Sequence, residues 1–206
     1  MQPSSGSSTS TRRGRPRSFD ASLIVDRALD AFWANGFEAT SLDELCAATG
    51  LSVSSVYAAF GSKRGLFDAT VERYRDYMAI GLDPLVEGHR GIDDLVRFIE
   101  WIRRELLTAK HPRGCLMVNT MVELAPRDAA LADATARHRR RIREALETAL
   151  RRAARLGEIP VRSAAARASL IQAALFGALV TVRAGGVDEA DQMLRGLVAE
   201  VRRWRR

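Results

Sequence analysis

The segment TSLDELCAATGLSVSSVYAAFG, residues 40 to 61, encodes two short helices around a Gly-Leu pair. Isolated helices this short are marginal in water, so each must be held by its ends and its neighbours. Ser41 precedes Glu44 by three residues, which predicts a capping box, and Gly50 supplies a helix stop. Ser52 predicts the cap of the second helix. So many capping residues indicate that the angle between the helices is fixed, as in a helix-turn-helix whose second helix enters the DNA major groove. A capped helical hairpin without a DNA role is the alternative.

The remainder of the chain carries helical periodicity and no strand pattern. With 206 residues, 47% of them apolar and 28% charged, it is long enough to bury a core. Helices are predicted from residue 20 to Asn35 and, after the helix-turn-helix, at 62–80, 92–109, 115–125, 128–156, 163–184 and 188–204.

This pattern predicts an all-α fold in three parts. A disordered basic arm spans 1–14, a helix-turn-helix DNA-binding domain spans 15–80 with the motif at 40–60, and a ligand-binding and dimerisation domain spans 85–206. Pro84 marks the boundary because proline disfavours the helix interior.

Composition excludes several classes of protein. Cys46 and Cys115 are the only cysteines, too few for a disulfide framework or a zinc site, and residues 1–13 lack the apolar core of a signal peptide. The longest apolar stretch, 170–182, is shorter than a membrane span. The histidines lack metal-ligand spacing, and there is no phosphate loop or nucleophile motif. We expect a cytoplasmic protein with no membrane role, which is not an enzyme and needs no cofactor or metal.

The segment ALDAFWANGFEATSLDELCAATGLSVSSVYAAFGSKRGLF resembles the first four helices of the TetR family of bacterial transcriptional regulators. The resemblance extends from Arg15 to about Tyr74. It includes the Gly36-Phe37 pair, Phe60 and the Ser62-Lys63 pair. One departure is Ala59, where many members carry an aromatic residue or histidine.

The residues expected to contact DNA follow from the pattern and the resemblance together. The outward residues of the second helix are small and uncharged, which permits close approach to base edges, while hydroxyls, the helix N-terminus and a lysine suit phosphates. The expected contacts are Thr40, Ser41, Ser52, Val53, Ser54, Ser55, Tyr57 and Lys63.

A basic arm precedes this domain. The net charge is +7, and in the front part of the chain the basic excess lies in the sequence RRGRPR. Arg13, Arg15 and Arg17 are candidates for a narrow A·T-rich minor groove. The alternative is a solvated tail that attracts DNA without specificity.

Two helices near the C-terminus are expected to form a homodimer. The helix at 163–184 is apolar on nearly all sides and must be covered, and the helix at 188–204 carries an apolar stripe. The family resemblance implies a four-helix interface between two chains. Burial within a single chain is the alternative.

A hydrophobic pocket for a small-molecule effector is the expected sensor. Methionines adapt well to varied ligands, but core packing is the alternative for every candidate, including the histidine. The candidate lining residues are Phe98, Trp101, Ile102, Met117, Met121, His138 and Phe176.

Two features stay open. Cys115 begins a predicted helix beside cations, a setting that lowers a thiol pKa and would suit a sensor of oxidants; an inert buried cysteine is the alternative. The run RHRRRIR, residues 137 to 143, reads as the solvated face of a long helix, with contact to acidic groups or DNA left open.

These observations together predict a ligand-responsive repressor that releases a palindromic operator in double-stranded DNA when an effector binds. A DNA-binding protein without a ligand and a thiol sensor using Cys115 are the alternatives.

Overall fold

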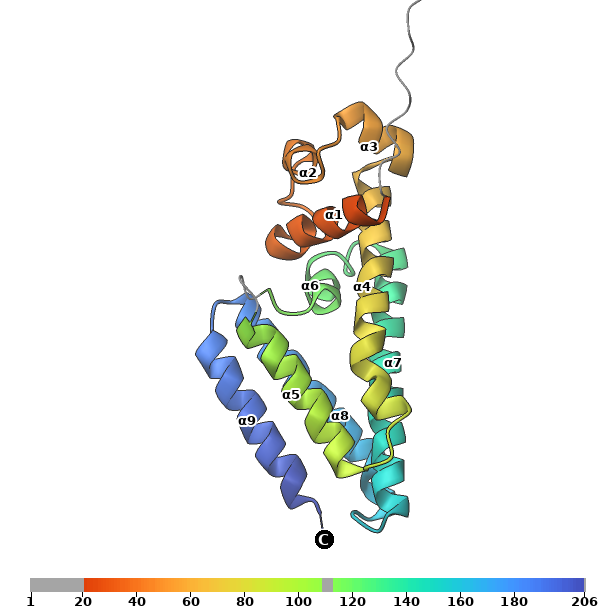
Figure 1. Ribbon diagram of the computed structural model, residues 1–206, viewed down its shortest axis with the longest axis vertical. Coiled ribbons are helices and arrows are strands. Elements are labelled where there is room, and N and C mark those ends of the chain that lie inside the picture. The colour runs from red at the N-terminus through yellow and green to blue at the C-terminus, as the bar shows by residue number, and fades with distance from the viewer. Residues whose placement is uncertain (1–20, 109–112, 206) are drawn as a thin grey trace, which may run out of the picture.

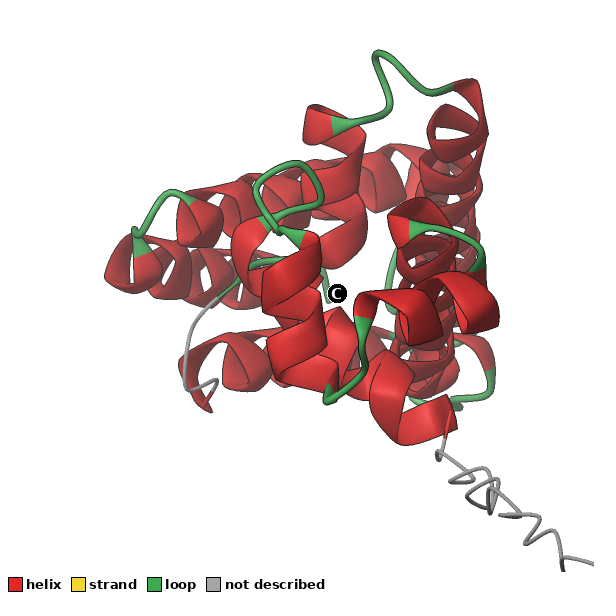
Figure 2. Cartoon of the chain, turned by 90° about the horizontal axis from the view of Figure 1, so that it is seen from above, coloured by secondary structure: helices red, strands yellow, loops and turns green. Residues whose placement is uncertain are grey.

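The structure, a computed structural model, describes residues 21–108 and 113–205. Within these ranges the chain forms nine α-helices and one 3₁₀ turn and contains no strand, which confirms the all-α prediction (Figure 2). In chain order the elements are α1 (Ala21–Asn35), α2 (Leu42–Thr49), α3 (Val53–Phe60), α4 (Lys63–Val86), α5 (Ile92–Thr108), α6 (Leu116–Glu123), α7 (Ala129–Arg155), the 3₁₀ turn η1 (Val161–Ser163), α8 (Ala164–Arg183) and α9 (Val187–Arg203).

The helices gather into two regions joined by α4 (Figure 1). α1, α2 and α3 lie at one end of the molecule, around the first turns of α4. α4 then runs alongside α7, while α5, α8 and α9 pack side by side and α6 lies between them and α1. The three helices at the end of the molecule are therefore attached to the larger region mainly through α4 and α6.

α1 packs on α4 because its apolar residues recur on one face. Ile24, Ala28 and Phe32 follow a spacing of four and are all buried. The ring of Phe32 meets that of Phe67 on α4 edge to face, with 5.1 Å between the ring centres. Burying each large side chain stabilises the fold by roughly 2 kcal/mol, so this face fixes α1 across α4.

α4 is longer than the sequence predicts. The expected end near Ile80, assigned because of Pro84, is wrong, since the helix continues to Val86. Pro84 lies in the last turn, where its missing N–H costs only one hydrogen bond. Leu82 and Leu85, on either side of it, are buried, and the burial of these side chains offsets that cost.

An arginine from α7 holds the end of α4. The Arg152 guanidinium donates hydrogen bonds to the carbonyls of Leu85 at 2.7 Å and Val86 at 3.2 Å, groups that a helix end leaves without intrahelical partners. Its Nε lies 3.4 Å from the buried carboxylate of Asp94 on α5. Arg152 thereby joins the ends of α4, α5 and α7 through one side chain that is 12% exposed.

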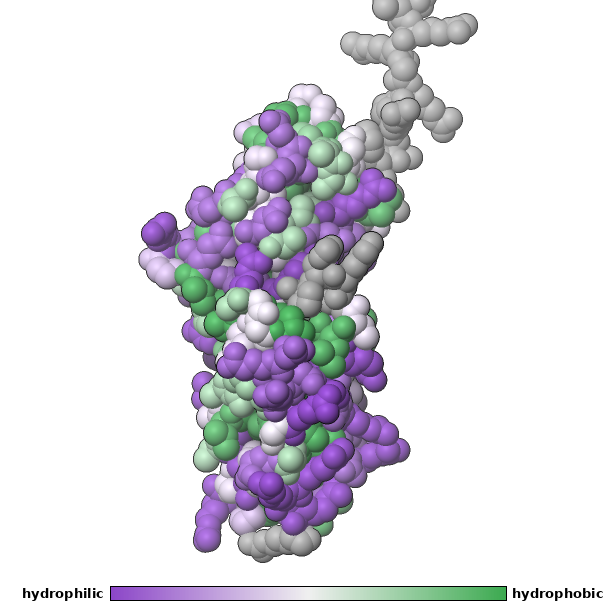
Figure 3. Space-filling view, turned by 90° about the vertical axis from the view of Figure 1, so that its left-hand side faces the viewer, coloured by the Kyte–Doolittle hydropathy of each residue, from purple (hydrophilic) through white to green (hydrophobic). Residues whose placement is uncertain are grey.

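α8 is a long helix composed mainly of apolar residues. The segment Val161–Arg183 is long and apolar enough to cross a membrane by length and composition alone, a test that a buried core helix also passes, and 33% of its most apolar window is buried. Its exposed or half-buried residues include a stripe at 166, 170, 173, 177 and 180, made only of alanine, leucine, glycine and valine. The surface seen from the side of α9 carries hydrophobic residues among hydrophilic ones (Figure 3).

Replacing Arg152 with methionine should lower the free energy of unfolding by about 3–5 kcal/mol, because it leaves the buried Asp94 unpaired and helix carbonyls without donors. Arg151→Met is the matched control. Arg151 is 58% exposed and pairs with Glu147 on the surface, so its loss should cost about 1 kcal/mol or less. Urea unfolding followed by circular dichroism measures both. Equal losses would show that Arg152 does not anchor α4.

Candidate functional site

α2 is fixed at both ends by the residues that the sequence singles out. The Ser41 hydroxyl accepts a hydrogen bond from the Glu44 N–H at 3.1 Å, and the Glu44 carboxylate accepts one from the Ser41 N–H at 2.6 Å. This confirms the predicted capping box. The hydrogen bonds from Ser41 lower the pKa of Glu44. Gly50 ends α2 with φ at 75°, a conformation that glycine adopts without strain.

α3 begins with a group of serines. The Ser52 hydroxyl accepts a hydrogen bond from the Ser55 N–H at 3.2 Å, so Ser52 caps the helix as predicted. Its oxygen also lies 2.9 Å from the hydroxyl of Ser54 and 2.8 Å from that of Ser55. Three short hydroxyl groups therefore meet at the N-terminus of α3, next to backbone N–H groups that point out of the helix.

The two faces of α3 differ. Val56 is fully buried, as is Leu45 of α2, and Phe60 is half-buried. On the opposite face Val53 is 40% exposed and Tyr57 is 49% exposed. Since α3 lies at one end of the molecule (Figure 1), this face is open to a macromolecule.

Lys63 begins α4 close to this surface. Its ammonium group lies 4.5 Å from the centre of the Phe37 ring and donates to the carbonyl of Glu38 at 3.4 Å. A cation over an aromatic face is stabilised by the ring. The lysine is thus held near the exposed end without an acidic side chain as hydrogen-bond partner among the described residues.

The sequence predicts a DNA contact for Thr40, but the structure buries its side chain. It is completely buried, and its hydroxyl donates to the carbonyl of Gly36 at 2.5 Å. A threonine beside a turn can satisfy a backbone group in this way, and the sequence alone does not distinguish this role from a phosphate contact. Ser41, the next residue, is exposed. Arg13, Arg15 and Arg17 lie outside the described residues.

A cavity of about 380 Å³ lies among α1, α4, α5 and the start of α6. The side chains of Trp33, Tyr74, Tyr77 and Trp101 form a row of aromatic contacts along it, with ring centres 5.1, 6.2 and 6.0 Å apart. The Tyr77 hydroxyl donates to the carboxylate of Glu105, which also lines the cavity. The wall of the cavity therefore combines this aromatic row with aliphatic side chains, the carboxylate of Glu105 and the guanidinium of Arg113.

The predicted lining residues divide between this cavity and other places. Trp101 and Ile102 line it. The other five do not: Phe98 and Met117 are buried in the core, while Phe176 and Met121 are half-buried against it. His138 lines a different cavity, between α4 and α7. Helical spacing places apolar residues inside a fold, but the empty space among them depends on how the helices cross.

Six polar or aromatic residues of the 380 Å³ cavity are not predicted from the sequence: Trp33, Tyr74, Tyr77, Glu105, Thr108 and Arg113. The two tyrosines lie three residues apart in α4, a spacing that places them on neighbouring positions of one helix surface. That spacing is the available signal, but it does not reveal that Trp33 and Trp101 face them.

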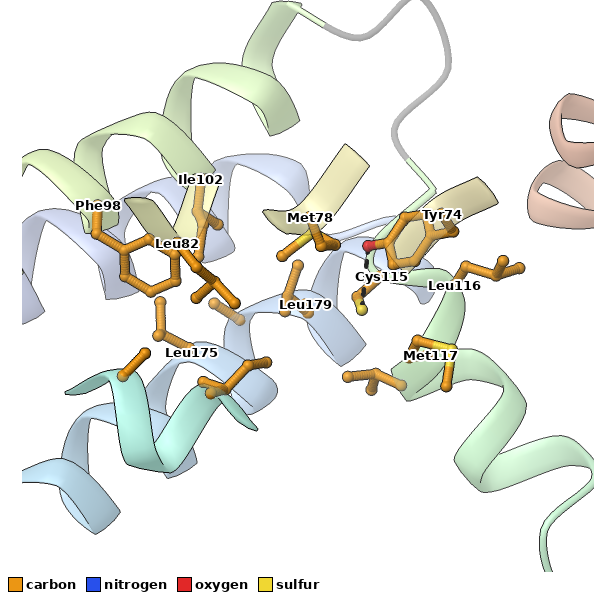
Figure 4. Packing of buried hydrophobic residues seen from close by; sticks show 14 of the residues in the cluster. Tyr74, Met78, Leu82, Phe98, Ile102, Cys115, Leu116, Met117, Leu175 and Leu179 are labelled. Atoms are coloured by element: carbon orange, nitrogen blue, oxygen red, sulfur yellow. Dashed lines mark hydrogen bonds between the residues drawn. The ribbon is translucent and has the colours of Figure 1, made fainter. Parts of the chain in front are cut away.

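Cys115 lies in the wall of the same cavity and accepts a hydrogen bond from the Tyr74 hydroxyl at 3.2 Å (Figure 4). The expectation of a lowered thiol pKa is wrong in direction. Burial raises the pKa of Cys115, and hydrogen bonds from Tyr74 and from the N–H groups of Val118 and Met117 offset this only in part. The thiol is 4% exposed, so desolvation outweighs the helix N-terminus that the sequence suggests.

α6 connects this cavity to the helix-turn-helix. The carbonyl of Gly114, two residues before the helix begins, accepts a hydrogen bond from the Trp33 indole at 3.2 Å. At its other end the Glu123 carboxylate accepts hydrogen bonds from the N–H groups of Glu38, at 2.9 Å, and Phe37, at 3.4 Å. One short helix therefore reaches from the cavity wall to the loop between α1 and α2.

Comparisons with known protein families match nearly the whole described chain. Residues 24–70 match the model described as bacterial regulatory proteins, tetR family. Residues 91–198 match the model described as tetracyclin repressor-like, C-terminal domain. The second match alone covers more than half of the chain.

Individual relatives agree with these matches. The HTH-type transcriptional repressor ComR of Escherichia coli (strain K12) is 35% identical over 151 residues, which span 72% of this chain and 71% of ComR. The uncharacterized HTH-type transcriptional regulator YezE of Bacillus subtilis (strain 168) is 29% identical over 148 residues, 71% of this chain and 76% of YezE. Among solved structures, a cysteine mutant of the regulator CifR complexed with 26-bp double-strand operator DNA superposes with a TM-score of 0.79 at 26% identity, covering 90% of this chain and 98% of that one.

The burial of Cys115 leads to a prediction about thiol reactivity. In the native protein at neutral pH, iodoacetamide should modify Cys46, which is half-buried, well before Cys115, because the thiolate is the reacting species and burial disfavours it. Mass spectrometry of timed samples measures both sites. In denaturant the two rates should converge. Faster native modification of Cys115 would contradict this account of its environment.

Proposed function

The chain belongs to the TetR family of bacterial regulatory proteins, and from this premise we propose that it is a homodimeric repressor that releases a palindromic operator when a small molecule binds. The observation that carries the proposal is the capped, outward-facing α3 at one end of the molecule. The family is one of transcriptional regulators, in agreement with the prediction that the chain is not an enzyme.

We propose that the exposed face of α3 reads the operator. Val53, Ser54 and Ser55 are exposed or half-buried and small, which lets the helix approach base edges in the major groove closely. The serine hydroxyls bond one another in the free protein and would exchange these contacts for contacts to DNA. Thr40 is not included, because its hydroxyl is buried and engaged with Gly36.

Phosphate contacts are assigned to the groups around α3. The groups on and next to this helix are Ser41, Ser52, Tyr57 and Lys63. The lysine is positioned by Phe37 and, within the described part of the chain, has no carboxylate bonded to it that would neutralise its charge. Contacts of this kind fix the register of the protein on the duplex. The expected minor-groove role of the arginine arm remains part of the proposal.

The dimer is proposed to form through α8 and α9. The apolar stripe of α8 includes Leu170, 54% exposed, and Val180, 47% exposed, and Met193 of α9 is 38% exposed beside it. The Met193 side chain approaches Gly177, where an added methyl group would lie 3.3 Å from it. A second copy covering this stripe removes apolar surface from water. It also places two α3 helices on successive major grooves, about 34 Å apart.

The 380 Å³ cavity is the proposed effector site. Its volume suits a small organic molecule, and its walls are mainly aromatic and aliphatic. Tyr74, Tyr77 and Met78 of α4 line it, as does Gly114 before α6. A ligand that binds one arrangement of these helices more tightly than the other would shift α4, α6 and the attached helix-turn-helix, whereas equal affinity for both would change nothing. A cytoplasmic location is part of the proposal, since a repressor must reach its operator DNA.

Selection of binding sites from random duplex DNA tests the proposal. For a specific dimer we expect the selected site to be palindromic. Its affinity should exceed that of scrambled DNA by about a thousandfold or more at a fixed salt concentration. Absence of enrichment would contradict sequence-specific binding. If an operator is found but no apolar compound that fills the cavity changes its affinity, the ligand-independent alternative replaces the effector part of the proposal.

Lys63→Ala should lower the slope of log affinity against log salt by about one unit, because one phosphate contact is lost. The control is Arg104→Ala, which makes the same change of charge at an exposed residue of α5, far along the chain from the helix-turn-helix. This variant should leave the slope unchanged. Tyr57→Phe should weaken binding to all sequences without changing the slope. An unchanged slope for Lys63→Ala would remove this lysine from the contacts.

Val180→Asp should convert the dimer to a monomer at micromolar concentration, because it places a charge in the proposed interface. Val86→Asp is the matched control, since Val86 is 46% exposed against 47% for Val180 but ends α4, away from α8 and α9 in the chain. Analytical ultracentrifugation distinguishes the species. A dimer that survives Val180→Asp would locate the interface elsewhere.

A further inference from the structure

The arginine run of α7 borders a second cavity, of about 190 Å³, between α7 and α4. Arg137 and Arg141 lie four residues apart, so they project from the same side of α7. Arg75 of α4 lines the cavity from the other side, and His138 lies in its wall. Met78 and Leu82 of α4 also line it. Three cations and an imidazole therefore surround one small hollow.

The positive charge of this hollow is poorly balanced. Arg75 bonds both carboxylate oxygens of Glu72 through a single nitrogen, at 2.7 and 2.5 Å. Among the described residues, Arg137 and Arg141 form no ion pair and donate no side-chain hydrogen bond. By contrast, Arg151 on the same helix pairs with Glu147. Like charges held around one space repel one another, and an anion between them removes this repulsion.

Acidic groups nearby do not fill this role. Asp83, Glu87 and Glu144 line the neighbouring hollow, which shares Arg141 with this one. None of these carboxylates lies within 4.0 Å of the Arg141 guanidinium, the limit for an ion pair. The guanidinium groups that face the 190 Å³ cavity therefore keep free donors.

His138 contributes a buried polar group to the same cavity. It is 8% exposed, and its Nε2 lies 3.9 Å from the sulfur of Cys115. Its other ring nitrogen has no hydrogen-bond partner among the described residues. Burial, followed by the charges of Arg141, Arg75 and Arg139 in that order, lowers the pKa of His138 to about 4. The ring is therefore neutral at pH 7, with one N–H to donate.

We propose that this cavity is a binding site for a small oxyanion, a phosphate or carboxylate group that is either free or the head group of a larger molecule. Guanidinium groups recognise both through paired, charge-assisted hydrogen bonds. The volume equals that of about six water molecules, which suits a head group better than a whole organic effector. The site adjoins the 380 Å³ cavity, with Met78 in the walls of both, and does not depend on the proposed operator binding.

Occupation of this site would connect α4 to α7. An anion bonded to Arg75 and to Arg137 or Arg141 bridges the helix that carries the helix-turn-helix and a helix of the larger region. The bridge lies part-way along α4, next to Tyr74, whose ring packs against Trp33 of α1. The oxyanion therefore stabilises one position of α4 relative to α7.

Calorimetric titration of inorganic phosphate into the full chain at pH 7, with ionic strength held constant by sodium chloride, tests the site. Arg137→Gln and Arg141→Gln should each weaken phosphate binding about tenfold or more, since each removes a charged hydrogen-bond donor. Arg140→Gln is the matched control: it carries the same charge change on the same helix, is exposed and does not line the cavity. It should leave the affinity unchanged. Equal weakening by all three variants would mean general charge attraction and would overturn the site.

A second measurement reports on the position of the anion. Phosphate should shift the ring resonances of His138 in nuclear magnetic resonance spectra, while those of His89, which is exposed, stay in place. Titrations of glycerol 3-phosphate and of acetate distinguish the sources of the oxyanion. If glycerol 3-phosphate binds and inorganic phosphate does not, the site takes a phosphate head group. If acetate binds and inorganic phosphate does not, the site takes carboxylates. If none of the three binds, the proposal is overturned. In that case, a smaller slope of log DNA affinity against log salt in Arg137→Gln would indicate that the arginine run at residues 137 to 143 contacts DNA.

Discussion

The burial of α4 in two places along its length is the constraint on which the rest of the molecule depends. Near its start Phe67 packs against Phe32 of α1, and near its end Leu82 and Leu85 are buried in the larger region, where Arg152 binds the last carbonyls. Twenty-four helical residues span about 36 Å. Because both ends are held in closely packed surroundings, a displacement of one end must repack the other or bend the helix. The aromatic cavity and the arginine-lined cavity both lie along this helix, so each is placed to influence how α4 is held.

Polar contacts give the packed helices their orientation. The hydrogen bonds from the loop between α1 and α2 to Glu123 involve a charged acceptor, the kind that contributes about 1.5–3 kcal/mol. Arg113 adds an ion pair to Asp30 of α1 at 2.8 Å and lies over the ring of Trp33. Apolar burial supplies more free energy but has little directional preference. The direction in which α1, α2 and α3 face therefore depends on a few polar contacts, and one of them, made by Arg113, lies in the wall of the 380 Å³ cavity.

The features that the sequence predicts well are local ones. The capping box of Ser41, the left-handed Gly50 and the cap at Ser52 are confirmed because each requires only residues a few positions apart. The burial of His138 also follows from its place on the apolar stripe of one helix. The wrong expectations for Pro84 and Cys115 depended on distant neighbours, whereas that for Thr40 turned on a local hydrogen bond to Gly36. Pro84 stays helical because of leucines buried against other helices, and the Cys115 thiol is desolvated by residues from several elements.

The sequence by itself therefore determined the helices, their caps, the helix-turn-helix and the family. These properties are written in periodicities and short spacings, for which the physical partners lie within one or two turns. Only the tertiary structure decided where empty space remains: it brings Trp33 and Trp101 to the tyrosines of α4, and Arg75 opposite Arg137 and Arg141. A cavity is the volume left when helices cross at particular angles. Those angles follow from the packing of whole surfaces, which the order of residues along any single helix does not contain.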